Sequence, residues 1–92
     1  MAAKVFVPEP DFGAMEEALK KVKAVEGLHA HMRFEVYNFA DGHRNAYEVY
    51  EAVAAEALAA GEWYYGQVRA ADVLEALERA AQAGAFAVKP AK

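Results

Sequence analysis

The sequence contains no cysteine, no serine and no threonine. Without cysteine the chain can form neither a disulfide nor a thiolate metal site. Without serine, threonine or cysteine, the catalytic triads that use a hydroxyl or thiol nucleophile are also excluded. Long apolar runs are missing as well, because none approaches the roughly 18–20 residues that a membrane-spanning helix needs. The sequence therefore predicts a cytoplasmic protein that is not an enzyme, carries no cofactor and enters no membrane.

Basic residues are in the minority, with ten lysines and arginines against fourteen acidic residues and a formal net charge of −4. Binding to duplex DNA draws its affinity from cations that neutralise phosphates, so this balance disfavours a nucleic-acid partner. A chain of 92 residues has room for one domain, 1–92. Alanine, at 23 residues, favours helix and lets neighbouring helices approach closely.

The amino-terminal third divides into an extended arm and a helix. Pro8 and Pro10 exclude helix from residues 1–10, which are predicted to be extended. Residues 11–27 are predicted to form a helix with Asp11 as its N-cap and Gly27 as its stop. Its apolar positions follow the spacing of one helical stripe, namely Phe12, Met15, Leu19, Val22 and Val25. Residues 28–92 would then form the core of the domain.

Residues 28–40 fit two patterns. As a helix, they place Leu28, Met32, Val36 and Phe39 on one stripe. As a strand, residues 30–37 alternate apolar and polar side chains, which would make the domain α+β. Periodicity alone does not decide between the two.

The second half of the sequence carries clearer boundaries. Asn45 and Glu48 form a capping-box pattern that predicts a helix ending at Gly61. A further helix is predicted over about 70–83, followed by a short strand over 85–88. Asp41 and Arg44 are predicted to stabilise the turn between residues 40 and 45 by a side-chain hydrogen bond or an ion pair.

Two segments carry a resemblance to a known kind of domain. They are the stretch Tyr37-Asn38-Phe39-Ala40-Asp41-Gly42-x-Arg44 and the run from Ala59 to Gly66. With the helix and strand that follow, residues 34–88 resemble small bacterial winged-helix modules, and most of all the segment attached to some bacterial zinc-aminopeptidase-like proteins. A looser likeness is to the peptide-binding winged-helix chaperone of PQQ biosynthesis.

This resemblance implies a mainly α, winged-helix-like domain with a short terminal β-strand. It favours the helix over the strand for residues 28–40, and it suggests that the terminal strand pairs near His43 and Arg44. It carries over no catalytic residue, because the zinc ligands of the aminopeptidase-like proteins belong to a separate and larger domain. The function it implies is protein or peptide interaction, including self-association.

Four aromatic residues are the predicted binding residues: Trp63, Tyr64, Tyr65 and, in the adjoining wing, Phe86. Tryptophan and tyrosine are enriched at binding hot spots. A second hypothesis is that an extended peptide adds as a strand at residues 85–89 or lies in the groove beside the last helix. The alternative function, DNA binding by a transcriptional regulator, would use that last helix to read bases.

The histidines are weak candidates for a metal site. His29 and His31 are two residues apart, and side chains at this spacing on a helix point in different directions. A zinc ion needs three or four converging ligands, so no metal site is predicted.

Overall fold

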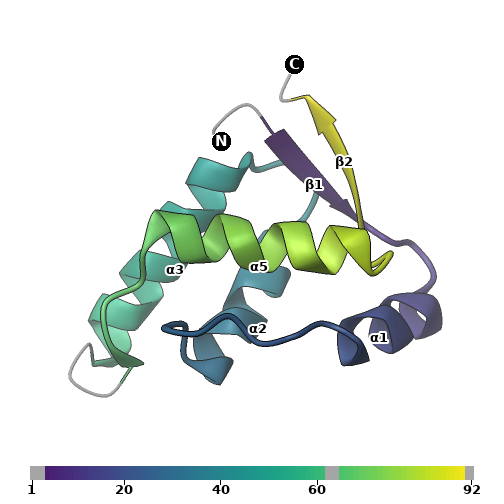
Figure 1. Cartoon of the computed structure of the whole chain (residues 1–92). Coiled ribbons are helices and arrows are strands. Elements are labelled where there is room, and N and C mark those ends of the chain that lie inside the picture. The colour runs from purple at the N-terminus through teal and green to yellow at the C-terminus, as the bar shows by residue number, and fades with distance from the viewer. Residues whose placement is uncertain (1–3, 62–64, 91–92) are drawn as a thin grey trace.

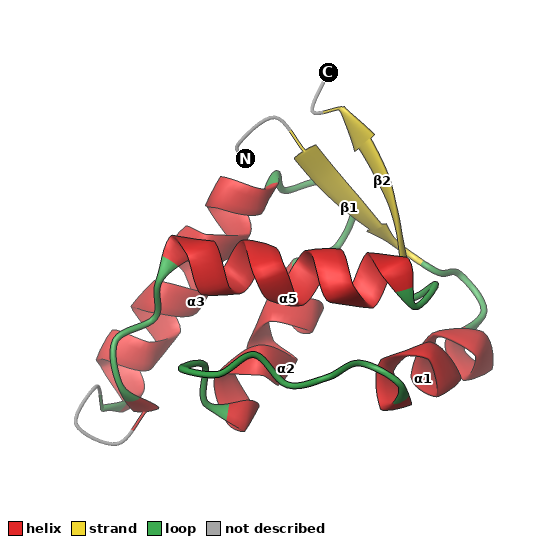
Figure 2. Ribbon diagram, viewed as in Figure 1, coloured by secondary structure: helices red, strands yellow, loops and turns green. Residues whose placement is uncertain are grey.

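The computed structural model describes residues 4–61 and 65–90, and this part of the chain is mainly helical. Its elements in chain order are β1 (Lys4–Pro8), α1 (Phe12–Lys20), α2 (Ala30–Phe39), α3 (Ala46–Ala60), α5 (Ala70–Gln82) and β2 (Phe86–Pro90). The two strands form an antiparallel sheet that lies over one end of the helices (Figure 1), and helix α1 lies to one side (Figure 2). The predicted class, mainly α with a short terminal strand, is confirmed.

Helix α1 begins where the sequence predicts and ends earlier. The Asp11 side chain accepts a hydrogen bond from the Ala14 amide at 3.0 Å, as an N-cap does. The helix ends at Lys20, so the prediction of a helix through residue 27 is wrong. The guanidinium of Arg79 on α5 donates hydrogen bonds to the carbonyl oxygens of Lys23 and Ala24, at 3.3 and 2.9 Å. These carbonyl groups would otherwise accept bonds within a longer helix.

Residues 30–39 form helix α2, so the alternative strand over 30–37 is wrong. Its first turn is capped by His29, whose Nδ1 accepts a hydrogen bond from the His31 amide at 3.0 Å. Met32 and Val36 are almost fully buried. Both side chains lie on the predicted helical stripe, and the helix buries them in the same core.

Helix α3 is set by its ends. The Asn45 side chain accepts from the Glu48 amide at 2.9 Å, and the Glu48 carboxylate accepts from the Asn45 amide at 2.8 Å. This reciprocal pair is the predicted capping box. Gly61 follows the last residue with a φ of +123°, a conformation that favours glycine. Helix α5 packs beside it through Val73, Leu77 and other buried residues on one face.

The amino-terminal arm is part of the sheet. Residues 4–8 are extended, as predicted, and pair antiparallel with β2 so that Phe6 lies opposite Val88. The prediction that the terminal strand pairs near His43 and Arg44 is wrong, because β1 occupies that position. β1 in turn makes an isolated bridge from Val5 to Asn45, which gives the sheet the spatial order Asn45, β1, β2.

The core lies between the sheet and helices α2, α3 and α5. Its largest fully buried side chains are Phe6, Met32, Leu77, Val36, Val49, Val53 and Val73. Phe6 comes from the arm and is only 1% exposed. Burying a phenylalanine side chain contributes roughly 1.5–3 kcal/mol to the free energy of folding, so β1 belongs to the folded unit.

Candidate peptide-binding edge

The four predicted binding residues do not form one exposed cluster among the described residues. Trp63 and Tyr64 lie outside the described residues. Tyr65 is half-buried, and its ring packs edge-on against His29 at 4.9 Å and stacks on His31 at 5.5 Å between centroids.

Phe86 is a core residue, which corrects its assignment as a surface contact. It is 4% exposed, and its ring lies 6.5 Å from that of Phe6 and 6.1 Å from that of Tyr37. As the first residue of β2 it turns its side chain inward, under the sheet. The assignment to the surface rested on the presence of an aromatic residue in the predicted wing. The backbone of Phe86, unlike its ring, belongs to a strand at the edge of the sheet.

Strand β2 has an open edge. It pairs with β1 on one side, and on its other side no strand among residues 4–61 and 65–90 pairs with it. An unpaired edge presents a row of backbone donors and acceptors to any segment that can extend the sheet. This is the feature that the strand-addition hypothesis requires at residues 85–89.

The register shows which backbone groups face the open edge. In an antiparallel pair, alternate residues turn their N–H and C=O groups toward the partner strand and away from it. The Glu9 amide donates to the Ala85 carbonyl at 2.9 Å, which fixes this alternation. Ala87 and Lys89 therefore face β1, whereas Phe86 and Val88 turn their backbone groups outward.

The prolines agree with this alternation. Pro8 lies opposite Phe86, and Pro90 lies opposite Lys4. Both are positions where the ladder between the two strands uses no N–H, so a residue without one is tolerated there. Pro90 also shortens the open edge. The outward donors of β2 are therefore the amides of Phe86 and Val88, and the outward acceptors include the carbonyl of Pro90.

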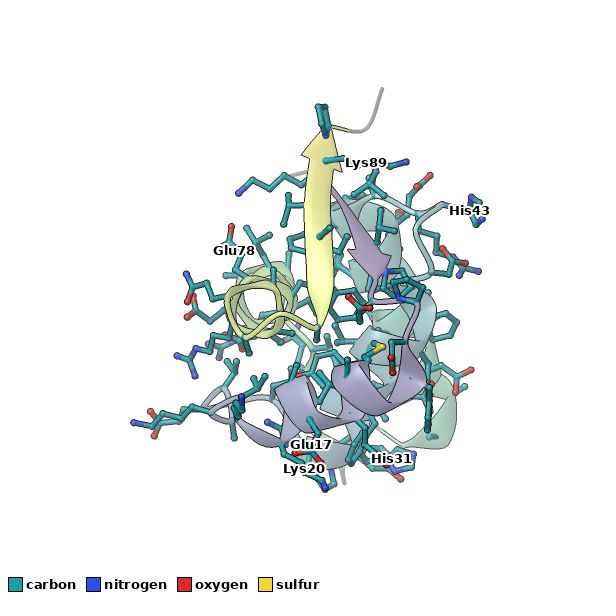
Figure 3. The ribbon with its side chains drawn as sticks, turned by 90° about the vertical axis from the view of Figure 1, so that its right-hand side faces the viewer. Glu17, Lys20, His31, His43, Glu78 and Lys89 are labelled. Atoms are coloured by element: carbon teal, nitrogen blue, oxygen red, sulfur yellow. The ribbon has the colours of Figure 1, made fainter. Side chains whose placement is uncertain are left out.

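A groove beside α5 adjoins these strands. It holds about 260 Å³ and is lined by Lys4, Phe6, Glu78, Ala81, Gln82 and Val88. Its lining is mixed, with three apolar and three polar residues, and it includes an ion pair in which the Lys4 ammonium lies 2.8 Å from the Glu78 carboxylate. Figure 3 shows Glu78 on α5 projecting beside β2. The groove has room for a small side chain, polar or apolar, from a segment that runs along the sheet.

The turn after α2 is a structural feature. The Asp41 carboxylate accepts from the amides of His43 and Arg44, at 2.9 and 3.2 Å, and lies 3.0 Å from the Arg44 guanidinium. The hydrogen bond from the His43 amide is the largest cause that lowers the pKa of Asp41. The Arg44 guanidinium also lies over the Phe39 ring, 5.2 Å from its centroid. These contacts fix the connection between α2 and α3.

Among the described residues, the phenol of Tyr37 is a buried ionisable group. Burial raises the pKa of Tyr37, and the nearby positive charge of Arg33 partly opposes this shift.

In the described residues no three side chains of histidine, cysteine, aspartate or glutamate gather as metal ligands would. Figure 3 shows His43 at the upper right and His31 at the lower right, well apart from each other. Nor does any helix in the described ranges have the length and apolar character to cross a bilayer.

Helix α5 offers little to DNA. Its charged side chains are Asp72, Glu75, Glu78 and Arg79. Its positively charged side chain, Arg79, lies 2.8 Å from the Glu75 carboxylate and also donates hydrogen bonds to the backbone of the loop after α1. A helix that reads the major groove presents arginine, lysine, asparagine or glutamine to bases. The DNA-binding alternative gains no support from this helix.

Comparisons with protein-family models, curated proteins and solved structures found no match for this chain.

Proposed function

We propose that this chain is a non-catalytic interaction domain of winged-helix type, and that it receives an extended segment of a protein or peptide along the open edge of β2. The observation that carries the proposal is the unpaired edge, where the amides of Phe86 and Val88 point away from β1. Strand addition satisfies such donors with backbone acceptors of the incoming segment.

Two further features support this function. The groove between α5 and the sheet offers a pocket for alternate side chains of the incoming segment, which is how strand addition acquires specificity. The order α2, α3, α5 and terminal strand also agrees with the winged-helix resemblance of residues 34–88. In this arrangement β1 from the arm lies between Asn45 and β2 and completes the sheet.

The test uses a displayed library of short linear peptides selected on the immobilised full chain. Selected peptides are then titrated against Val88→Pro, which removes the outward amide at the middle of the edge, and against Val88→Ala, which keeps that amide. Proline is tolerated at this position because the β1 ladder does not use its N–H. We expect Val88→Pro to weaken binding at least about tenfold, the effect of roughly 1.4 kcal/mol, and Val88→Ala to weaken it less.

A second variant tests the aromatic surface predicted from the sequence. The double variant Trp63→Ala and Tyr65→Ala is titrated with the same peptides. Retained affinity in this variant, together with loss in Val88→Pro, supports the edge. Loss in the double variant with full affinity in Val88→Pro would move the site to the aromatic segment, and the absence of any selected peptide would contradict peptide binding.

A further inference from the structure

The open edge of β2 lies beside helix α5. In Figure 3, β1 lies to the right of β2, whereas α5 lies to its left, so a strand that pairs with the open edge runs along α5. Glu78, Ala81 and Gln82 of α5 line the groove of about 260 Å³ together with Val88. The surface of α5 therefore influences which side chains the added strand can carry.

The direction of the side chains in the added strand follows from that of β2. Directly paired residues in adjacent antiparallel strands turn their side chains to the same face of the sheet. Val88 lines the groove, so a residue that pairs with Val88 also turns its side chain toward α5. Ala87 and Lys89 turn to the opposite face, because side chains alternate along a strand. Every second residue of the added segment thus faces α5.

Glu78 is the charged residue that α5 contributes to this groove. Its carboxylate lies 2.8 Å from the ammonium of Lys4, and these two side chains are 37% and 47% exposed. An ion pair with this exposure contributes little to stability, so another cation can replace Lys4 at small cost. The cation of α5 itself, Arg79, is held by Glu75 and by the loop after α1. The groove therefore presents a carboxylate that a cation from an added segment can reach.

Sequence analysis assigned no binding residue to α5. The available signal was the spacing of Glu78 and Gln82, which are four positions apart and therefore lie on one face of the helix. The sequence did not show that this face adjoins the end of the sheet. That position depends on Lys4 and the rest of β1, which pair with β2 from the other end of the chain.

We propose that the segment accepted by β2 is basic, with a lysine or arginine that pairs opposite Val88 or Pro90 and places its charge against Glu78. This inference rests on the proposed strand addition and names the kind of partner. Lys4 lies opposite Pro90 on the β1 side and reaches Glu78, so its ammonium occupies the position that the partner's cation would take. The net charge of −4 also attracts a basic segment to the chain.

A second copy of β2 fits this edge less well than a basic segment. Two copies joined through β2 by a two-fold axis would form one continuous sheet. The two α5 helices, each with its Glu78, would then lie on the same face of that sheet. Like charges brought together at an interface disfavour association.

The composition of the peptides selected on the full chain is the first test. Lysine and arginine should be enriched over the unselected library, at alternate positions of the peptide. Each selected peptide is then compared with a counterpart in which glutamine replaces the basic residue. We expect the natural chain to bind the counterpart about two- to fivefold more weakly, as for an exposed ion pair. Added salt should reduce the difference between the two peptides.

Two variants of the chain break the same ion pair and should have opposite effects. Glu78→Gln removes the carboxylate and should bind the basic peptide about two- to fivefold more weakly. Lys4→Met removes the competing ammonium and should bind the same peptide more tightly, with no such gain for the glutamine counterpart. An ion pair that only stabilised the fold would shift both variants in the same direction. Glu56→Gln, at an exposed position of α3, is the matched control and should bind as the natural chain does.

The outcomes separate this proposal from strand addition itself. Peptides that require the Val88 amide but show no enrichment in basic residues would overturn the basic partner and leave strand addition intact. The same holds if Glu78→Gln binds the basic peptide as tightly as Glu56→Gln, or if Lys4→Met binds it more weakly than the natural chain. If no peptide is selected, strand addition fails and the basic partner fails with it.

Discussion

The ring of Phe6 meets the ring of Phe86 edge-on, with centroids 6.5 Å apart and an angle of 87° between the ring planes. Phe6 belongs to β1, near the start of the chain, and Phe86 belongs to β2, near its end. Edge-to-face aromatic pairs are favourable beyond the area they bury. This contact joins the two ends of the chain and explains why the arm is a strand of the sheet rather than a loose extension.

The first prediction concerns this contact. Phe6→Ala should lower the free energy of unfolding by about 3–5 kcal/mol, the usual loss for a phenylalanine removed from a core. Urea unfolding followed by circular dichroism measures it. The matched control is Phe12→Ala, in which the lost ring is 78% exposed and the change should stay within about 0.5 kcal/mol. Equal effects in the two variants would contradict the placement of Phe6.

The second prediction concerns the loop after α1. Arg79→Met keeps the apolar part of the side chain and removes the donors to Lys23 and Ala24. Hydrogen bonds from charged groups contribute roughly 1.5–3 kcal/mol, so stability should fall by about that amount or somewhat less at this partly exposed site. Hydrogen exchange at the Leu28 amide, which bonds to the Val25 carbonyl at 3.2 Å, should accelerate.

Glu75→Gln separates the two roles of Arg79. It weakens the ion pair of 2.8 Å between Arg79 and Glu75 and leaves the loop bonds in place. Exposed pairs of this kind contribute about 0.2–1 kcal/mol, so the effect should be small. A larger loss in Glu75→Gln than in Arg79→Met would show that the loop bonds do not stabilise the fold.

The third prediction concerns acid. Because its contacts lower the pKa of Asp41 below the ordinary value of 3.8, its charged form is stabilised by folding. That stabilisation is fully present above pH 3.8 and is lost as the pH falls through the lower folded pKa. Near neutral pH, the free energy of unfolding of the natural chain should exceed that of Asp41→Asn by a margin that does not change with pH. Below about pH 4 this margin should narrow. Urea unfolding at a series of pH values measures the margin, and a margin that widens in acid would contradict this sign.

Local signals made part of the fold predictable. Helix α3 could be predicted because its determinants, Asn45, Glu48 and Gly61, all lie at its own ends. Helix α2 was undecided from periodicity, and the resemblance to winged-helix modules favoured the correct structure. The course of the chain after α1 could not be predicted from nearby residues, because the carbonyls of this loop accept hydrogen bonds from Arg79, which lies more than fifty positions away in the sequence.

The candidate site was predictable to a lesser degree. A strand at residues 85–88 with a free edge was one of the hypotheses, since alternating apolar residues indicate extended backbone. Which side of β2 stays open depends on β1, and the sequence gives no sign that residues 4–8 would pair there. Phe86 was assigned from its residue type, whereas its exposure is set by the alternation of the strand and by Phe6 beneath it.

The central claim is that the outward backbone groups of β2 accept an added strand, and residue-resolved hydrogen exchange tests it most directly. In the free chain, the amides of Phe86 and Val88 should exchange fast and those of Ala87 and Lys89 slowly, because only the latter face β1. Saturation with a selected peptide should slow Phe86 and Val88 and leave Ala87 and Lys89 unchanged. Slow exchange at Val88 in the free chain, or no slowing at either outward amide on binding, would contradict the account.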